Sequence, residues 1–126
     1  MPYIVDTYAW VEYFRGSEVG AKIKEKIESK GNITPTIVLA ELSKKFVEWG
    51  RTDFGEKLRF IKYISQIEVL DEETALLAGE IRARRPVQGM GLIDCILLAL
   101  ARKYSIKVLT GDEHFRGLSE AEFIGD

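Results

Sequence analysis

Short apolar runs alternate along the chain with longer segments of helical periodicity. Runs rich in branched apolar residues predict short strands, at residues 3–5, 33–34, 66–70, 107–110 and 122–124. Segments of helical character are predicted at residues 8–15, 18–29, 36–49, 53–65, 72–84 and 92–104. The pattern is clearest at 18–29 and 36–49, where apolar residues recur every four positions, and 92–104 is nearly all apolar. This alternation favours an α/β fold, with a mostly parallel sheet flanked by helices in an α/β/α sandwich.

Residues at the ends of these segments support the predicted boundaries. Asp6 or Thr7 can cap the first helix, because both carry a side-chain oxygen that accepts a backbone hydrogen bond. Pro86 is predicted to end the helix that precedes it. No serine- or proline-rich linker and no internal repeat divides the chain, so one domain is expected to span residues 1–126.

The composition limits the available chemistry. The 126 residues carry 18 lysines and arginines against 20 aspartates and glutamates, and the net charge of −2 excludes nucleic-acid binding by bulk positive charge. One cysteine, Cys95, and one histidine, His114, exclude an internal disulfide, a cysteine zinc site and catalysis by paired histidines. Carboxylates must therefore carry most of any catalysis. Cys95 is expected to be a small buried residue, and His114 receives no role.

The sequence carries no sign of a targeting segment. No basic stretch followed by an apolar one marks a signal peptide. No apolar run approaches the roughly 20 residues of a membrane span. We therefore expect a soluble, cytoplasmic protein that does not bind a membrane.

Two aspartates follow predicted strands. Asp6 comes directly after the run at 3–5, and Asp112 comes just after the run at 107–110. Ligands of open α/β sheets bind outside the carboxyl ends of the strands, so both positions favour a functional site. Each aspartate alone is equally explained as a helix cap or as part of a turn.

Two further acids interrupt helices that are otherwise apolar, Asp94 in the helix at 92–104 and Glu41 in the helix at 36–49. A buried carboxylate costs several kcal/mol unless it is paired or binds a metal. The alternatives are that Asp94 faces water in the first helical turn and that Glu41 is exposed and pairs with Lys45.

The four acids together indicate a metal site. Converging carboxylates repel one another and raise their own pKa values. A divalent cation removes this repulsion, and Mg²⁺ and Mn²⁺ prefer such oxygen ligands. Receiver domains and haloacid-dehalogenase-type phosphatases are disfavoured, because Asp6 lacks the neighbouring acid that their sites need.

Four motifs in this order resemble the PIN domain, and within it the VapC-type toxin ribonucleases. The opening YIVDTYAW (residues 3–10) is similar to the family's hydrophobic strand followed by Asp-Ser/Thr. AEL (40–42) resembles its internal glutamate motif, and LIDCILLALA (92–101) resembles its third acidic motif. LTGDEHF (109–115) resembles its Thr-x-Asp motif. The match spans nearly the whole chain.

This resemblance implies a metal-dependent endoribonuclease. The four acids would bind one or two Mg²⁺ or Mn²⁺ ions, with Asp6 and Asp94 as the strongest direct ligands. Glu41 and Asp112 would bind directly or through water. The cation would lower the pKa of a bound water, which would attack the scissile phosphorus of RNA. Thr110 would orient Asp112 or that water.

Because an acidic pocket repels RNA, the phosphate contacts are expected at its rim. The candidate cations are Arg15, Lys44, Lys45, Arg82, Arg84 and Arg85. The alternative for the basic run at 82–85 is a solvated helix end. Aromatic side chains could stack on bases or line a dimer interface, although at helical spacing they more often belong to the core: Trp10, Tyr13, Phe14 and Trp49. Thr7 is assigned to capping the first helix.

The resemblance also implies partners. It predicts a cognate antitoxin protein that inserts a segment into the active-site groove, with an arginine that meets the acids. It further predicts a homodimer, with the first two helices or the helix at 53–65 as the interface. Two other functions remain open, namely a housekeeping RNA-processing nuclease and a PIN scaffold that binds RNA or protein with little catalysis.

Overall fold

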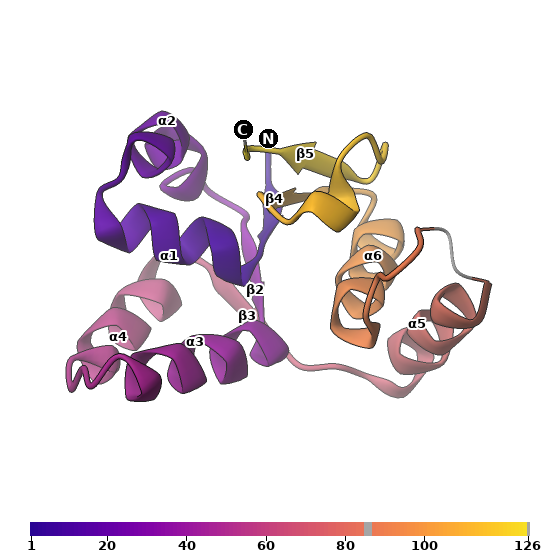
Figure 1. The fold of residues 1–126 in the computed structure, drawn as a ribbon, viewed down its shortest axis with the longest axis horizontal. Coiled ribbons are helices and arrows are strands. Elements are labelled where there is room, and N and C mark those ends of the chain that lie inside the picture. The colour runs from indigo at the N-terminus through magenta and orange to yellow at the C-terminus, as the bar shows by residue number, and fades with distance from the viewer. Residues whose placement is uncertain (85–86, 126) are drawn as a thin grey trace.

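The central sheet holds its strands in parallel (Figure 1). The computed structural model describes residues 1–84 and 87–125. Within them the strand order is β3-β2-β1-β4-β5, and every neighbouring pair is parallel. The strands are β1 (Tyr3–Val5), β2 (Ile33–Pro35), β3 (Gln66–Glu68), β4 (Lys107–Thr110) and β5 (Ala121–Phe123). The predicted α/β class is therefore confirmed.

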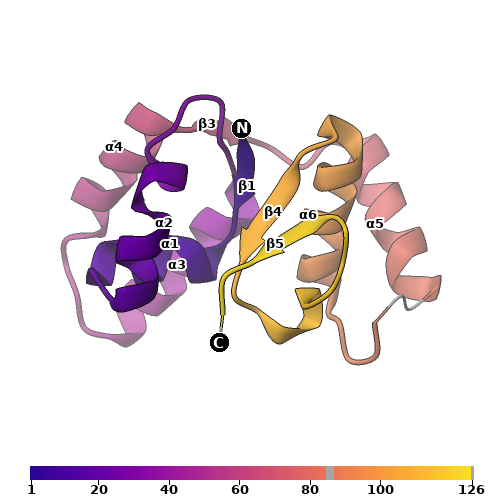
Figure 2. The same ribbon diagram turned by 90° about the horizontal axis from the view of Figure 1, so that it is seen from above.

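Helices cover both faces of the sheet and give the three predicted layers. α1 to α4 pack on one face and α5 and α6 on the other (Figures 1 and 2). Their bounds are α1 Thr7–Arg15, α2 Glu18–Ile27, α3 Thr36–Glu48, α4 Phe54–Ile64, α5 Glu72–Arg84 and α6 Leu92–Tyr104. The predicted helices begin and end within two residues of these bounds. Pro86, which was predicted to end α5, lies outside the described residues.

The first helix is capped by Asp6 and not by Thr7. The Asp6 side chain accepts a hydrogen bond from the backbone N–H of Ala9 through Oδ1 at 2.9 Å, and Thr7 is already the first residue of α1. The assignment of Thr7 as a cap is therefore wrong. At the other end, Gly16 adopts the left-handed conformation with φ 64°, which glycine tolerates without strain.

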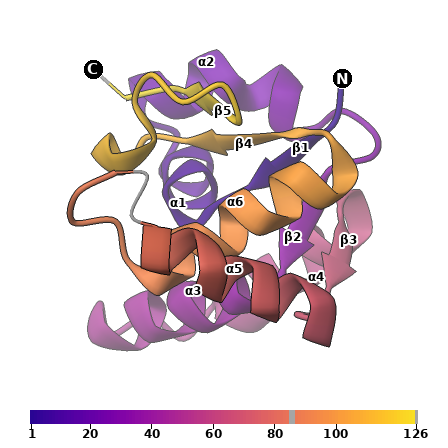
Figure 3. The same cartoon turned by 90° about the vertical axis from the view of Figure 1, so that its right-hand side faces the viewer.

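The core lies between the sheet and the helices on its two faces. β1 is buried throughout, and α6 is buried over residues 95–101, which confirms that its apolar run is internal. α6 packs against α5, and Figure 3 shows both helices in front of the sheet. Trp10 is fully buried, whereas the Trp49 side chain is 49% exposed. Trp10 therefore belongs to the core, while Trp49 lies at the surface beside Phe46.

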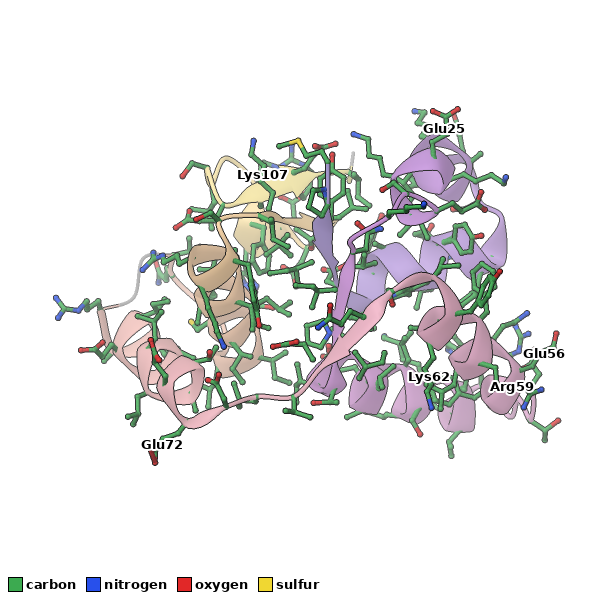
Figure 4. The ribbon with its side chains drawn as sticks, turned by 180° about the vertical axis from the view of Figure 1, so that it is seen from behind. Glu25, Glu56, Arg59, Lys62, Glu72 and Lys107 are labelled. Carbon is green, nitrogen blue, oxygen red and sulfur yellow. The ribbon has the colours of Figure 1, made fainter. Side chains whose placement is uncertain are left out.

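The outer helices present charged side chains to water. Figure 4 labels several of these exposed residues, among them Glu25 on α2, Glu56 on α4 and Glu72 on α5. Among the described residues, no helix is long and apolar enough to cross a lipid bilayer.

Candidate active site

Four acids that lie far apart in the sequence line one cavity of about 290 Å³. Asp6 joins β1 to α1, and Asp112 follows β4, so both stand at the carboxyl edge of the sheet. Asp94 is in the first turn of α6, and Glu41 projects from α3. The wall of the cavity is completed by Thr7, Tyr8, Val11, Lys45 and Leu97.

Asp6 is the most deeply buried of these acids, with 5% of its surface exposed. Burial raises the pKa of Asp6 from 3.8 to about 7, because the charged form loses its hydration. Hydrogen bonds from Thr110 and from the Ala9 backbone oppose this rise, and the charges of Asp112 and Glu41 add to it. A cation in the cavity would stabilise the ionised form of Asp6.

Glu41 is held by the residue next to Asp6. The hydroxyl of Thr7 donates a hydrogen bond to Glu41 Oε1 at 2.6 Å, which ties α3 to the start of α1. Lys45 Nζ lies 6.0 Å from the centroid of the Trp49 ring, and Glu41 is only partly exposed. The structure therefore gives Glu41 a partner other than the Lys45 considered from the sequence.

Asp94 is partly buried and does not simply face water. Its side chain is 18% exposed, and its pKa is raised by burial first and then by the charge of Asp112. Asp112 caps the short 3-10 helix η1 (Glu113–Phe115), and its Oδ1 accepts a hydrogen bond from the His114 backbone at 2.9 Å. Thr110 Oγ1 accepts from the backbone N–H of Asp112 at 3.0 Å, so this hydroxyl fixes the turn that carries Asp112.

Gly111 allows this turn to approach α1 closely. A Cβ atom at Gly111 would lie only 2.2 Å from Cε1 of Tyr8, well inside the contact distance of two carbon atoms. A glycine at this position therefore lets the Tyr8 ring fill the wall of the cavity next to Asp112.

His114 stands beside the acids, although the sequence suggested no role for it. Its Nδ1 lies 3.2 Å from Asp94 Oδ2 and 3.1 Å from Asp112 Oδ1. Both contacts are at ion-pair distance, and neither has the directed geometry of a hydrogen bond. The signal in the sequence was the position of His114, two residues after an acid that follows a strand.

The donor set fits a divalent cation. Ligand atoms of Asp94, Asp112 and His114 lie within 4.8 Å of one another. The raised pKa values of Asp6 and Asp94 mean that a nearby positive charge would stabilise the ionised form of both carboxyl groups. A site built mainly of carboxylate oxygens suits Mg²⁺ or Mn²⁺.

The predicted basic residues do not all reach this cavity. Lys45 lines it, and Arg15 lines a neighbouring hollow of about 410 Å³ together with Trp49 and Arg51. Val11 lines both hollows, so they adjoin. Arg15 also forms an ion pair with Glu12 at 3.0 Å.

The remaining cations lie elsewhere. Lys44 pairs with Glu48 on the exposed side of α3, at 3.6 Å. Arg84 lines a separate hollow between α5 and α6, and Arg82 is partly buried on the same helix. Arg85 lies outside the described residues.

Comparison with known proteins agrees with this architecture. The family model of the PIN domain matches residues 3–121. A toxin–antitoxin complex from Klebsiella pneumoniae contains a chain with TM-score 0.80 and 17% identity, and the match covers 98% of both chains. VapC20 of Mycobacterium tuberculosis, a sarcin–ricin loop cleaving toxin, has TM-score 0.76 and 16% identity, covering 97% of this chain and 98% of its own.

A further solved structure is VapBC2 of Rickettsia felis bound to a DNA fragment from its promoter. It matches with TM-score 0.66 and 17% identity, over 98% of this chain and 97% of that chain. No curated protein sequence matches the chain. At these identities the three structures establish a shared fold.

Proposed function

The chain belongs to the PIN domain family, and from this premise we propose that it is a metal-dependent endoribonuclease that acts as the toxin of a toxin–antitoxin pair. The observation that carries the proposal is the convergence of Asp6, Glu41, Asp94 and Asp112 on one cavity at the carboxyl edge of the sheet. Residues that serve only as caps or surface charges would have no reason to share a cavity. The reaction is the hydrolysis of an RNA phosphodiester bond.

The four acids would hold one or two Mg²⁺ or Mn²⁺ ions, with Asp6 and Asp94 as the main ligands. When bound, such ions supply the positive charge and the activated water that phosphodiester hydrolysis requires. The protein's own part is to position the ligands. Thr7 orients Glu41 through its hydrogen bond, and Thr110 fixes the turn that carries Asp112.

The RNA would enter along the side of the cavity that carries positive charge. Lys45 lines the cavity, and Val11 connects it to the hollow that contains Arg15 and Trp49. Lysine and arginine side chains bind phosphates, and an exposed indole ring stacks on bases without selecting a sequence. We therefore assign RNA contacts to Lys45, Arg15 and Trp49. Lys44, Arg82 and Arg84 lie outside these two hollows.

An antitoxin is the protein partner that the proposal requires. The similarity to chains of toxin–antitoxin complexes supports this partner, and an arginine of the antitoxin placed among the four acids would offset part of their negative charge in the absence of metal. A homodimer through α1 and α2, or through α4, belongs to the same proposal, as does action in the cytoplasm.

The test is a cleavage assay on a mixed pool of structured RNAs. The wild-type protein is compared with Asp94→Asn and with Glu25→Gln, which alters an exposed acid on α2, a helix that does not line the cavity. We expect cuts with Mn²⁺ or Mg²⁺ in the wild type and in Glu25→Gln, and none with EDTA or in Asp94→Asn.

Growth of bacteria that express the chain tests the toxin assignment. Induction of the wild type should arrest growth, and induction of Asp94→Asn should not. Metal-dependent cleavage without growth arrest would favour a housekeeping nuclease. Equal activity of the wild type and Asp94→Asn in the cleavage assay would refute the site.

A further inference from the structure

His114 lies at the cavity rim and has no part in the function proposed above. Its side chain is 38% exposed, yet the Nδ1 atom is buried and faces the acids. The opposite ring nitrogen points toward the loop before α6, where a Cβ at Gly89 would lie 3.5 Å from Nε2. The ring therefore presents one nitrogen to the site and the other to a glycine that leaves room for it.

The backbone around His114 holds the ring in this orientation. The His114 N–H donates to Asp112 Oδ1, which fixes the first turn of η1. The next residue, Phe115, is fully buried and anchors η1 in the core. A side chain placed between a cap and a buried anchor is preorganised for binding.

The two distances from His114 Nδ1 to the carboxylate oxygens match the shell of a single ion. In an octahedral site with bonds of about 2.1 Å, neighbouring ligand atoms lie about 3.0 Å apart. His114 Nδ1 lies 3.2 Å from Asp94 Oδ2 and 3.1 Å from Asp112 Oδ1. With a neutral ring, Nδ1 can offer its lone pair to a cation held by both carboxylates, whereas a protonated ring would form an ion pair with them at the same distances.

We propose that His114 is a nitrogen ligand, through Nδ1, of a divalent cation that Asp94 and Asp112 also bind, and that it makes this site prefer transition-metal ions such as Mn²⁺ over Mg²⁺. Imidazole binds first-row transition metals well, whereas Mg²⁺ selects oxygen ligands. The inference rests on the proposed function only in taking the four acids to be a metal site. It requires no RNA.

The test is Mn²⁺ and Mg²⁺ binding in the absence of RNA. His114 is the only histidine of the chain, so a protein freed of any histidine tag has one imidazole that can couple to bound Mn²⁺. Pulsed EPR of the wild type should show the ¹⁴N coupling of an imidazole ligand, and His114→Ala should lose it. Titration should show Mn²⁺ affinity falling about tenfold in His114→Ala, with Mg²⁺ affinity changing much less.

Thermal unfolding in EDTA shows whether His114→Ala still folds, and His114→Gln provides a second variant that fills the space. An absent ¹⁴N coupling in the wild type, or an equal loss of Mn²⁺ and Mg²⁺ affinity, would overturn the inference. The experiments also distinguish a failure of this inference from a failure of the proposed nuclease function. If Mn²⁺ binds with imidazole coupling but no RNA is cut, the ligand assignment stands and the nuclease does not.

Discussion

Asp6→Asn is the substitution that tests the electrostatics of the site most directly. The asparagine is nearly the same size, and its Oδ1 can still accept the hydrogen bond from Ala9 that caps α1. The change therefore removes a buried charge without removing the cap. In the absence of metal we expect the variant to be more stable than the wild type above neutral pH.

The magnitude follows from the pKa of Asp6. A rise from 3.8 to about 7 means that ionising Asp6 costs the folded state about 4 kcal/mol more than the unfolded state. The folded pKa is the higher one, so stability is fully present below the ordinary value of 3.8 and is lost as the pH rises through about 7. Asparagine is neutral at every pH and does not suffer this loss.

The assay is urea denaturation in EDTA at several pH values from 4 to 8. The unfolding free energy of Asp6→Asn should exceed that of the wild type by an amount that grows from near zero at pH 4 to at most about 4 kcal/mol at pH 8. Glu25→Gln, on the exposed face of α2, serves as the matched control and should follow the wild-type profile. Saturating Mn²⁺ should shrink this advantage of the variant, because it binds the wild-type site, which keeps all four acids, more tightly than the site that has lost Asp6.

Parallel profiles for the wild type and Asp6→Asn across this range would refute the reasoning. They would mean that Asp6 is well solvated or already paired in the metal-free protein, and the case for a cation based on its burial would then be lost.

Further measurements test the surroundings of the site. Millimolar Mn²⁺ or Mg²⁺ should raise the melting temperature of the wild type, and an unchanged melting curve would count against the metal pocket. Lys45→Ala should weaken RNA binding and lower its salt dependence by about one phosphate contact, whereas Lys44→Ala, next to it but paired outside the cavity, should not. Single-stranded RNA should quench the fluorescence of Trp49 but not that of Trp10, which is fully buried; Trp49→Phe would leave no quenching. Gly111→Ala should destabilise the protein by about 1–3 kcal/mol in denaturant titrations, because its methyl group would lie 2.2 Å from a neighbouring ring; an unchanged midpoint would show that the ring moves aside freely.

Periodicity helped to predict most of the helices, because they are amphipathic or apolar along their length. The exception is α5, whose apolar residues are not gathered on one face. The order of the strands depends on distant pairs such as Tyr3 with Lys107, about which local patterns carry no information. The 3-10 helix η1 was missed for a similar reason, since three residues are too few to show a period.

The acids could be found from the sequence because each is out of place among apolar neighbours or at a strand end. Thr7 was assigned wrongly because both Asp6 and Thr7 carry a side-chain oxygen suited to a cap. In the structure the Thr7 hydroxyl instead donates to Glu41, 34 residues away, and Asp6 caps the helix. His114 was missed because a single histidine in a sequence does not show that its ring folds back beside Asp94 and Asp112. The cations at the rim could not be ranked, since only the folded chain separates Lys45 from Lys44.

The position of β1 in the sheet has a consequence for how the chain is made. β1 lies between β2 and β4, so one of its edges pairs early and the other waits for a strand that the ribosome produces about a hundred residues later. Asp112, which follows that late strand, emerges after the other three acids. While the chain is being made, the pocket therefore lacks Asp112 until the other three acids and the strand before it have been added.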